Sequence, residues 1–524
     1  MGEGIGQRYR YADFEVDRTI DDFTFTLHSP PPPKEIDNFG GTAKDQKFTT
    51  PPSKDFLRKL DYKIINEEEL TPKEEEFIDT QWERREKGYW FYNNGYLEYI
   101  TGTHYYYLTA WNIVRVEEYV KRDGKIGKRR ISGLPTFTDS DRDYFYIWND
   151  VEHDDNCFGL LHITNRRDGK TYRATATLNE SISRTPDSIA GIQSKTDTDG
   201  KKIFKKLVKS WKKLPEYWKP VDVGDSDPAK VLEYKNPKKR SSKTQKKEYS
   251  EVLDSEINYG NAKEEYYDGD GLFRLFHDEV GKTEPKIANV HTRWYIAKEC
   301  LSDGSEVTGK ALLTTTVEDM EKKGGVFCKK LWDDSDITSE TYKITGQTKS
   351  GLKRYFKPAY YGLRGADKSE KGDETPNFID EWGYTDIEAA EAYLIKIEKT
   401  LSGEDLISRK RKYPRTVKDC FLISGKQEVF ATHKIYQQQD YNELYLSKGK
   451  VRRGNFVWID KANHIADFKD DPNGFFEISW LPSPERQNHF EYDSRGFPSP
   501  LNHLDGVIGV DPFDNKTTVE NRKY

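Results

Sequence analysis

The sequence predicts an α/β protein whose central sheet is mainly parallel. Short apolar runs stand at residues 158–165, 188–194, 271–279 and 311–316, and helical or irregular stretches separate them. Strands that are buried on both faces of a parallel sheet are apolar throughout and only a few residues long. Because parallel strands need crossover connections, short strands that alternate with long connections indicate a domain of this class.

The composition is that of a folded but well-solvated protein. The chain has 524 residues, of which 33% are charged and 13% aromatic. This aromatic content argues against disorder along the whole chain, whereas the low hydrophobic share of 34% implies long polar loops. No window approaches the roughly 18 consecutive apolar residues of a bilayer span, and the N-terminus has no apolar segment for secretion. We therefore expect no membrane partner and a cytoplasmic location.

The four cysteines predict neither a zinc site nor a disulfide framework. They lie far apart in the sequence, without a CxxC or Cys/His pairing, at Cys157, Cys300, Cys328 and Cys420. Reduced thiols fit a cytosolic address.

The N-terminal part divides into two segments. Residues 1–60 are polar and contain a run of four prolines, which predicts an extended or partly disordered arm. Residues 61–150 predict a helix and hairpin subdomain, with a capped helix over 71–87. Aromatic residues alternate on both sides of Asn94 and Gly95, a pair typical of the tight turn in a β-hairpin.

The C-terminal part predicts further helices and a small sheet. Helical patterns cover residues 387–401 and 433–447, and residues 456–468 and 474–481 are consistent with an antiparallel element.

Charge is unevenly distributed along the chain. Residues 201–248 contain 16 Lys and Arg against 6 Asp and Glu, within a chain whose net charge is −6. An acidic protein can still present such a basic strip to a polyanion, and this stretch is interpreted as an insertion. A solvated lysine-rich loop is the alternative.

The most informative segment is a strand that runs directly into a phosphate-binding loop. In HITNRRDGKTYRAT, the GxxxxGK[ST] pattern is matched at its end, while Thr164 stands where the first glycine belongs. Backbone N–H groups of the turn can surround a phosphate, Lys170 can reach the β- and γ-phosphates of ATP, and Thr171 can ligate Mg²⁺. Arg166 and Arg167 also lie in this loop, where an arginine can contact the γ-phosphate in cis, and exposed structural arginines are the alternative. The candidate nucleotide-binding residues are Arg167, Gly169, Lys170 and Thr171, and the alternative is a chance GKT.

An acidic pair supplies the second requirement of an ATPase. Asp278 and Glu279 end the apolar run 271–279, where one carboxylate can enter the Mg²⁺ shell and the other can orient the attacking water. Ligands bind at the carboxyl ends of strands in open α/β sheets, so this position fits a catalytic role. An ordinary pair at a helix N-terminus is the alternative, but the upstream loop favours an ATPase.

Three threonines end another predicted strand. The hydroxyls of Thr314, Thr315 and Thr316 can sense the γ-phosphate and couple its loss to a neighbouring element. The alternative is a strand in which threonine is favoured by its β-propensity.

These motifs, in this order, resemble the large terminase subunit of tailed bacteriophages. NRRDGKT is similar to the deviant Walker A of that family, HDE to its Walker B and LLTTT to its coupling motif. Residues 407–425 are similar to its YPxTxxEAF stretch, although Lys418, Asp419 and Cys420 depart from that pattern. The aromatic segments are most similar to terminases of Bacteroidetes phages, including the crAss-like group. The resemblance covers about residues 70–524.

The resemblance implies a P-loop NTPase core of the RecA/ASCE type. Residues 151–430 would form this ATPase domain, residues 431–500 a linker or small subdomain, and residues 501–524 the beginning of an RNase H-like nuclease. Arg166 would be the loop arginine and Thr315 the centre of the coupling motif.

The resemblance also implies a metal-dependent nuclease. Asp511 in GVIGVDPFD would be its first ligand for Mg²⁺ or Mn²⁺. Such a site needs several carboxylates from separate strands. Since the sequence stops soon after Asp511, we expect no DNA cleavage by this chain, through truncation or a split gene.

The implied function is that of an ATP-driven motor that translocates double-stranded DNA into the prohead. Its partners would be the portal protein and the small terminase subunit, and it would act as a homo-oligomeric ring. It would work in the host bacterial cytoplasm, transiently on the procapsid, and be absent from the mature virion. A DExx-type helicase is an alternative, although residues 340–524 lack its arginine-rich motif. A nucleotide-gated DNA-binding assembly protein without hydrolysis is another.

Overall fold

The computed structural model divides the chain into two compact units, Met1–Lys426 and Gln427–Tyr524, which are described separately. The structure describes residues 17–20, 23–33, 48, 53–120, 124, 126–220, 227–234, 253–317, 320, 324–364, 376–423, 438–439, 441–442, 452–462, 465–478, 481 and 490–500. Asp511 and most of the predicted helix 433–447 lie outside these residues.

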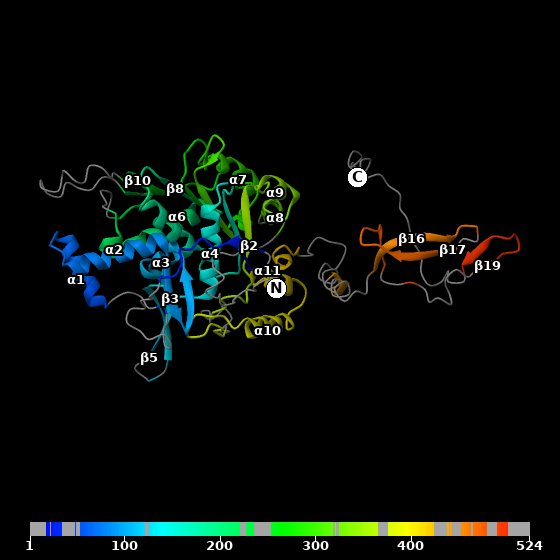
Figure 1. The fold of residues 1–524 in the computed structure, drawn as a ribbon, viewed down its shortest axis with the longest axis horizontal. Coiled ribbons are helices and arrows are strands. Elements are labelled where there is room, and N and C mark those ends of the chain that lie inside the picture. Colours follow the sequence, from blue (N-terminus) through cyan, green and yellow to red (C-terminus); the bar gives the residue numbers. More distant parts are fainter. Residues whose placement is uncertain are drawn as a thin grey trace. The chain divides into compact units, whose positions relative to one another are not determined.

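A seven-stranded, mostly parallel sheet forms the centre of the first unit (Figure 1). Its order is β15-β7-β14-β11-β8-β10-β9, and only the edge pair β9–β10 is antiparallel. The bounds are β7 Gly159–Ile163, β8 Ile189–Gln193, β9 Val231–Tyr234, β10 Ser255–Tyr259, β11 Arg274–Asp278, β14 Lys310–Thr315 and β15 Leu352–Phe356. The four predicted apolar runs correspond to β7, β8, β11 and β14, so the predicted mainly parallel α/β sheet is confirmed.

Helices cover both faces of this sheet. Successive residues of β14 belong to different hydrophobic clusters, Leu312 to one and Leu313 to the other, because side chains alternate along a strand. The first cluster includes residues of α3 Gly102–Thr109, α4 Asp139–His153, α5 Lys170–Ile182 and α6 Asp197–Trp211. The second includes residues of α7 Val290–Glu299, α8 Gly325–Asp333 and α12 Val417–Cys420.

Part of the predicted basic insertion 201–248 belongs to this core instead. Its first residues form most of α6, in which Ile203, Phe204 and Leu207 are buried while the lysines between them stay on the solvated face. A 3₁₀ turn, Glu216–Trp218, and the edge strand β9 follow. The lysine-rich outer face of this amphipathic helix therefore accounts for five of the 16 Lys and Arg residues of 201–248.

The predicted N-terminal helix and hairpin are confirmed. Helix α2, Pro72–Lys87, begins with a capping box between Thr71 and Glu74. Strands β3 Tyr89–Asn93 and β4 Tyr96–Ile100 pair around Asn94 and Gly95, both of which have positive φ as a two-residue turn requires.

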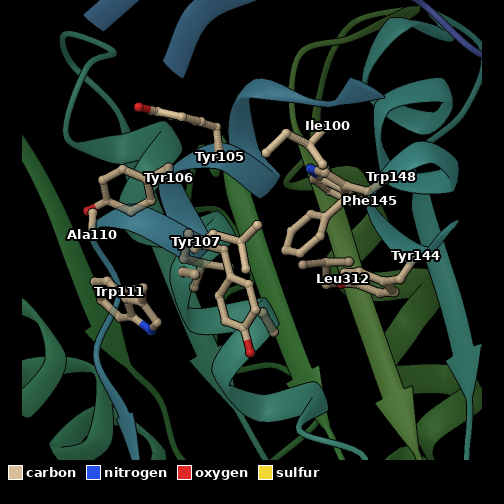
Figure 2. Close-up of a cluster of buried hydrophobic side chains, with 14 of the residues drawn as sticks. Ile100, Tyr105, Tyr106, Tyr107, Ala110, Trp111, Tyr144, Phe145, Trp148 and Leu312 are labelled. Atoms are coloured by element: carbon tan, nitrogen blue, oxygen red, sulfur yellow. The ribbon is translucent and has the colours of Figure 1, made fainter. Parts of the chain in front are cut away.

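The aromatic residues after this hairpin lie in a helix rather than in a strand. Tyr105, Tyr106 and Tyr107 are buried on α3, where Tyr106 packs against Trp111 and Tyr107 against Phe145 (Figure 2). These side chains belong to the same hydrophobic cluster as residues of β7 and α5. Residues 61–150 therefore share the core of the sheet.

The N-terminal segment 1–60 is not an extended arm throughout. It contains the antiparallel strands β1 Asp17–Ile20 and β2 Phe23–Thr26, and α1 Lys54–Ile65 begins within it. Phe25 is buried, and the backbone N–H of Thr26 donates to Asp150 Oδ1 of α4 at 3.0 Å. A few alternating apolar residues therefore attach this otherwise polar segment to the core of the first unit.

The remaining elements connect or flank these layers. They are β5 Ile113–Val120, β6 Ile126–Gly133, the 3₁₀ turn η4 Val280–Lys282, β12 Ser302–Asp303, β13 Glu306–Val307, α9 Glu340–Thr345, α10 Ile387–Glu398 and α11 Gly403–Lys412. Helix α10 confirms the helix predicted over 387–401. Within the described part of the chain, no helix is long and apolar enough to cross a membrane.

The second unit contains the predicted antiparallel element. Strand β16 Arg452–Asp460 pairs with β17 Ile465–Asp470 on one side and β18 Phe476–Ile478 on the other. A separate pair is formed by β19 Phe490–Tyr492 and β20 Pro498–Pro500.

We expect Gly159→Ala to destabilise the first unit by about 2 kcal/mol or more, because an added methyl overfills a packed interior. Gly159 has φ +151°, and a Cβ there would lie 2.1 Å from the carbonyl oxygen of Ala311 on β14. Urea unfolding would measure the change. Gly271→Ala is the matched control, since a Cβ at Gly271 meets nothing within 4 Å, and equal stability of the two variants would contradict this expectation.

Candidate active site

The phosphate loop joins the carboxyl end of β7 to the first turn of α5. The backbone N–H of Thr164 donates to the carbonyl of Thr315 at 3.1 Å, so the loop starts in register with β14. Gly169 precedes the helix with φ 85°, a left-handed conformation that favours glycine. No side chain caps α5 at this end. The N–H groups of its first turn are therefore placed to bind an anion.

Lys170 and Glu279 meet at the carboxyl edge of the sheet, although 109 residues separate them. Lys170 Nζ lies 2.9 Å from Glu279 Oε1 and donates to Thr316 Oγ1 at 3.3 Å. Lys170 is buried and Glu279 largely so. The two charges that the sequence assigns to one site are thus in direct contact.

Thr171 and Asp278 form the second junction of the site. Thr171 Oγ1 donates to Asp278 Oδ2 at 3.2 Å, and Thr314 Oγ1 donates to Asp278 Oδ1 at 2.7 Å. A hydroxyl and a carboxylate are the hard oxygen ligands that Mg²⁺ prefers when substrate phosphates and water complete its shell. Among the described residues, no group of three or more His, Cys, Asp and Glu side chains is placed to hold a metal. Thr171 and Asp278 therefore fit a Mg²⁺ ion whose other ligands would come from a bound phosphate and water.

The backbone at Glu279 turns sharply out of β11. Glu279 has φ 58°, which is unusual for a residue with a side chain. Its Oε2 lies 2.9 Å from Lys282 Nζ and accepts from the backbone N–H of Thr316 at 3.4 Å. Strained backbone concentrates at functional sites, and here it directs the carboxylate toward Lys170.

Burial and charge together set the pKa values of the three ionisable groups. Burial alone would lower the pKa of Lys170, but the charges of Glu279 and Asp278 raise it above its ordinary value. Burial raises the pKa of Asp278, despite the opposing charge of Lys170. Burial also opposes ionisation of Glu279, yet Lys170 and Lys282 outweigh it and lower its pKa to about 2. Glu279 is therefore ionised at neutral pH.

All three predicted threonines lie at this edge, with different contacts. Thr314 contacts Asp278 and Thr316 contacts Lys170, as described above. Thr315 Oγ1 accepts from the backbone N–H of Gly281 at 2.9 Å. The three hydroxyls thus join β14 to the phosphate loop, to β11 and to the turn after β11.

The two predicted arginines lie at the rim. The side chains of Arg166 and Arg167 are exposed, and the backbone N–H of Arg166 donates to the carbonyl of Lys412 at 3.2 Å. Arg167 has φ 65°, so the chain reverses between the two arginines and Gly169. The structure places both arginines in the loop, where they are exposed, in contrast to the ion-pair cluster of Lys170, Asp278, Glu279 and Lys282.

Asp168 is a loop residue that the sequence did not single out. Its buried carboxylate is in contact with Arg173 of α5 and with Lys357, which follows β15. Arg173 Nη1 also donates to Asp141 Oδ1 at 2.6 Å. Burial would raise the pKa of Asp168, but Arg173 and Lys357 hold it well below its ordinary value. The phosphate loop is thereby fixed to α4, α5 and the segment after β15.

A separate cavity of about 1170 Å³ lies in the same unit. It is lined by residues of α1, β5, β6 and 377–383, and includes none of the side chains of the ion-pair cluster. The candidate site is therefore defined by the contacts of Lys170 with Glu279 and of Thr171 with Asp278, and not by this cavity.

No family model and no curated protein matches the chain. Among solved structures, the chain is similar to the large terminase ATPase domain of Thermus phage P74-26, with 12% identity and a TM-score of 0.33 over 50% of this chain and 89% of that one. An arginine-to-alanine mutant of that domain gives 13% identity and a TM-score of 0.32, over 52% and 96%. The HK97 bacteriophage large terminase gives 12% and 0.33, over 54% and 51%. Because these identities and TM-scores are low, the assignment of the chain to a mainly parallel α/β fold rests on the strand order of its sheet.

We expect Asp168→Asn to destabilise the first unit by about 3–5 kcal/mol at neutral pH, because it removes the buried anion of Lys357 and leaves Arg173 with Asp141 alone. Urea unfolding of both proteins would measure this difference.

The difference should shrink as the pH falls. The pKa of Asp168 is lower in the folded protein than in the unfolded chain, where it is near 3.8. Its ion pairs therefore stabilise the fold fully at pH values above 3.8, and this stabilisation is lost as the pH falls toward the folded-state pKa. A difference that stays constant from pH 7 to pH 3 would contradict the ion-pair explanation.

Proposed function

We propose that this chain is an ATP-hydrolysing motor of the large terminase class that drives double-stranded DNA into a viral prohead. The observation that carries the proposal is the convergence of Lys170, Asp278 and Glu279 at the carboxyl edge of one parallel sheet. A GKT loop and an acidic strand end that meet in this way are suited to phosphoryl transfer. The order of the three motifs in the sequence supports the terminase class.

ATP would bind at the N-terminus of α5. Lys170 would exchange its contact with Glu279 for the β- and γ-phosphates, and the N–H groups of the first turn would surround the same phosphates. Thr171 and Asp278 would hold Mg²⁺, which when bound neutralises charge on the phosphates. Once Lys170 has moved, Glu279 Oε1 is free to orient the attacking water. The buried, ionised carboxylate is suited to this role.

The threonines of β14 would carry the state of the site to the rest of the domain. Thr314 contacts Asp278, Thr315 contacts the turn after β11, and Thr316 contacts Lys170. A change at one of these contacts would therefore displace the strand end and alter the other two. Because the strand is buried on both faces, a shift at its end is transmitted to packed neighbours. Arg166, exposed at the rim, would contact the γ-phosphate of its own or a neighbouring subunit.

DNA would bind through phosphate contacts that carry no base readout. The exposed lysines of α6 and the segment up to residue 248 are the proposed contact, and binding should weaken steeply with salt. The portal protein and the small terminase subunit are proposed partners of a homo-oligomeric ring in the host cytoplasm. Asp511 would belong to a nuclease that uses Mg²⁺ or Mn²⁺.

We expect Lys170→Ala to reduce ATP hydrolysis to less than about a hundredth of the wild-type rate, because the buried cation that would bind the phosphates is lost. Phosphate release at saturating ATP and Mg²⁺ measures this effect. Lys286→Ala is the control, since Lys286 lies in an exposed loop of the same unit. Unchanged turnover in Lys170→Ala would refute the loop assignment.

Glu279→Gln separates a motor from a nucleotide-gated DNA-binding protein. For a motor, we expect ATP to bind at least as tightly as in the wild type, since the anion that competes for Lys170 is gone. Hydrolysis should fall on the order of 100-fold or more, because the water loses its orienting base. Binding of a fluorescent ATP analogue and phosphate release would be measured side by side. Absence of hydrolysis in the wild type, with binding intact, would instead favour the non-hydrolysing alternative.

Metal removal tests the Thr171–Asp278 pair. ATP should raise the thermal unfolding midpoint in the presence of Mg²⁺, since ligands that bind only the folded state stabilise it. A chelator should remove most of this shift, and Asp278→Asn should do the same with Mg²⁺ present. An ATP-induced shift that is indifferent to both changes would exclude this pair as the metal site.

A further inference from the structure

Glu279 is held by a second lysine that the sequence motifs do not include. Lys282 Nζ lies 2.9 Å from Glu279 Oε2, while Lys170 Nζ lies 2.9 Å from the other oxygen, Oε1. Lys282 is itself buried, with 7% of its side chain exposed. The two lysines come from different elements, α5 and η4, and approach the carboxylate through separate oxygens.

The turn that carries Lys282 is held by its own hydrogen bonds. The backbone N–H of Lys282 donates to the carbonyl of Glu279 at 3.0 Å, which closes the 3₁₀ turn η4. The N–H of Gly281 donates to Thr315 Oγ1 on β14. A Cβ at Gly281 would lie 3.0 Å from Thr315 Oγ1 and 3.3 Å from Cys328 Sγ, so the turn packs closely on its neighbours. Lys282 is therefore presented by a constrained backbone.

We propose that Lys282 is the positioning residue of Glu279, which keeps Oε2 in place when Lys170 leaves Oε1 for the phosphates of ATP. This inference rests on the proposed function, because it assumes that Lys170 transfers to a nucleotide. A buried carboxylate that lost its single cation would either follow that cation or be left unpaired at a large cost. With Lys282 present, the carboxylate keeps one cation and one orientation throughout the exchange.

The other contacts of Glu279 cannot replace this anchor. The charges of Asp278 and Glu279 repel each other, and the N–H of Thr316 is neutral and reaches Oε2 at 3.4 Å. Charge-assisted hydrogen bonds are roughly twice as strong as neutral ones. Lys282 is thus the cation among the described contacts that remains on the carboxylate once Lys170 has moved.

Lys282→Met tests the proposal in steady-state ATP hydrolysis. We expect kcat to fall about 10- to 100-fold, the size expected when a reacting group is misplaced by about 1 Å, while KM for ATP stays within about twofold of wild type. Lys282→Arg should recover most of kcat, because it restores a cation at the same oxygen. Lys286→Met, an exposed lysine in the next loop, is the matched control and should leave both constants unchanged.

A second variant covers the case in which Lys282→Met does not fold. Lys282→Gln keeps a hydrogen-bond donor of similar length without the charge, and should lower kcat without changing KM. Unchanged kcat in whichever of Lys282→Met and Lys282→Gln folds would overturn the proposal, as would an Arg variant no better than Met. A wild-type protein that hydrolyses no ATP would refute the proposed function itself, which is a different result.

Discussion

The compensation of buried charge at one edge of the sheet governs this structure. Lys170, Asp278, Glu279 and Lys282 lie together in the interior, where an unpaired ion is costly and a paired one is tolerated. Two lysines therefore face two carboxylates, and the hydroxyls of β14 complete the remaining hydrogen bonds. The arrangement requires the phosphate loop, the end of β11 and the end of β14 to remain in register, so the fold and the site depend on each other.

The strand order explains why these groups meet. Strand β14 lies between β7 and β11, so the loop after β7 and the acids after β11 lie on either side of its threonines. Parallel strands end at the same edge, and that edge therefore collects the loop, the acids and the hydroxyls. Asp168 adds a second anchor, since its contacts with Arg173 and Lys357 connect the loop to β15 on the far side of β7.

Much of this edge could be predicted from the sequence, because strands buried on both faces are short apolar runs and their ends are marked by polar residues. The meeting of Lys170 with Glu279 followed from that pattern. The contact of Asp168 with Lys357 did not, since 189 residues separate them, the loop motif gives Asp168 no role, and Lys357 lies in no motif. The lysines of α6 suggested an insertion, because a count of charged residues does not show the helical spacing of the buried residues between them. The buried Phe25 was missed because the segment around it is mostly polar.

The contact between Lys170 and Glu279 places an anion of the chain itself beside the cation that the proposed function assigns to the phosphates of ATP. Any phosphate that enters must displace a carboxylate tethered next to the same cation at high effective concentration. Under the proposed function, the tethered carboxylate would lower the apparent affinity for every phosphate ligand and would return to Lys170 when that ligand loosens. Such an internal competitor would favour rapid release of the product over tight retention.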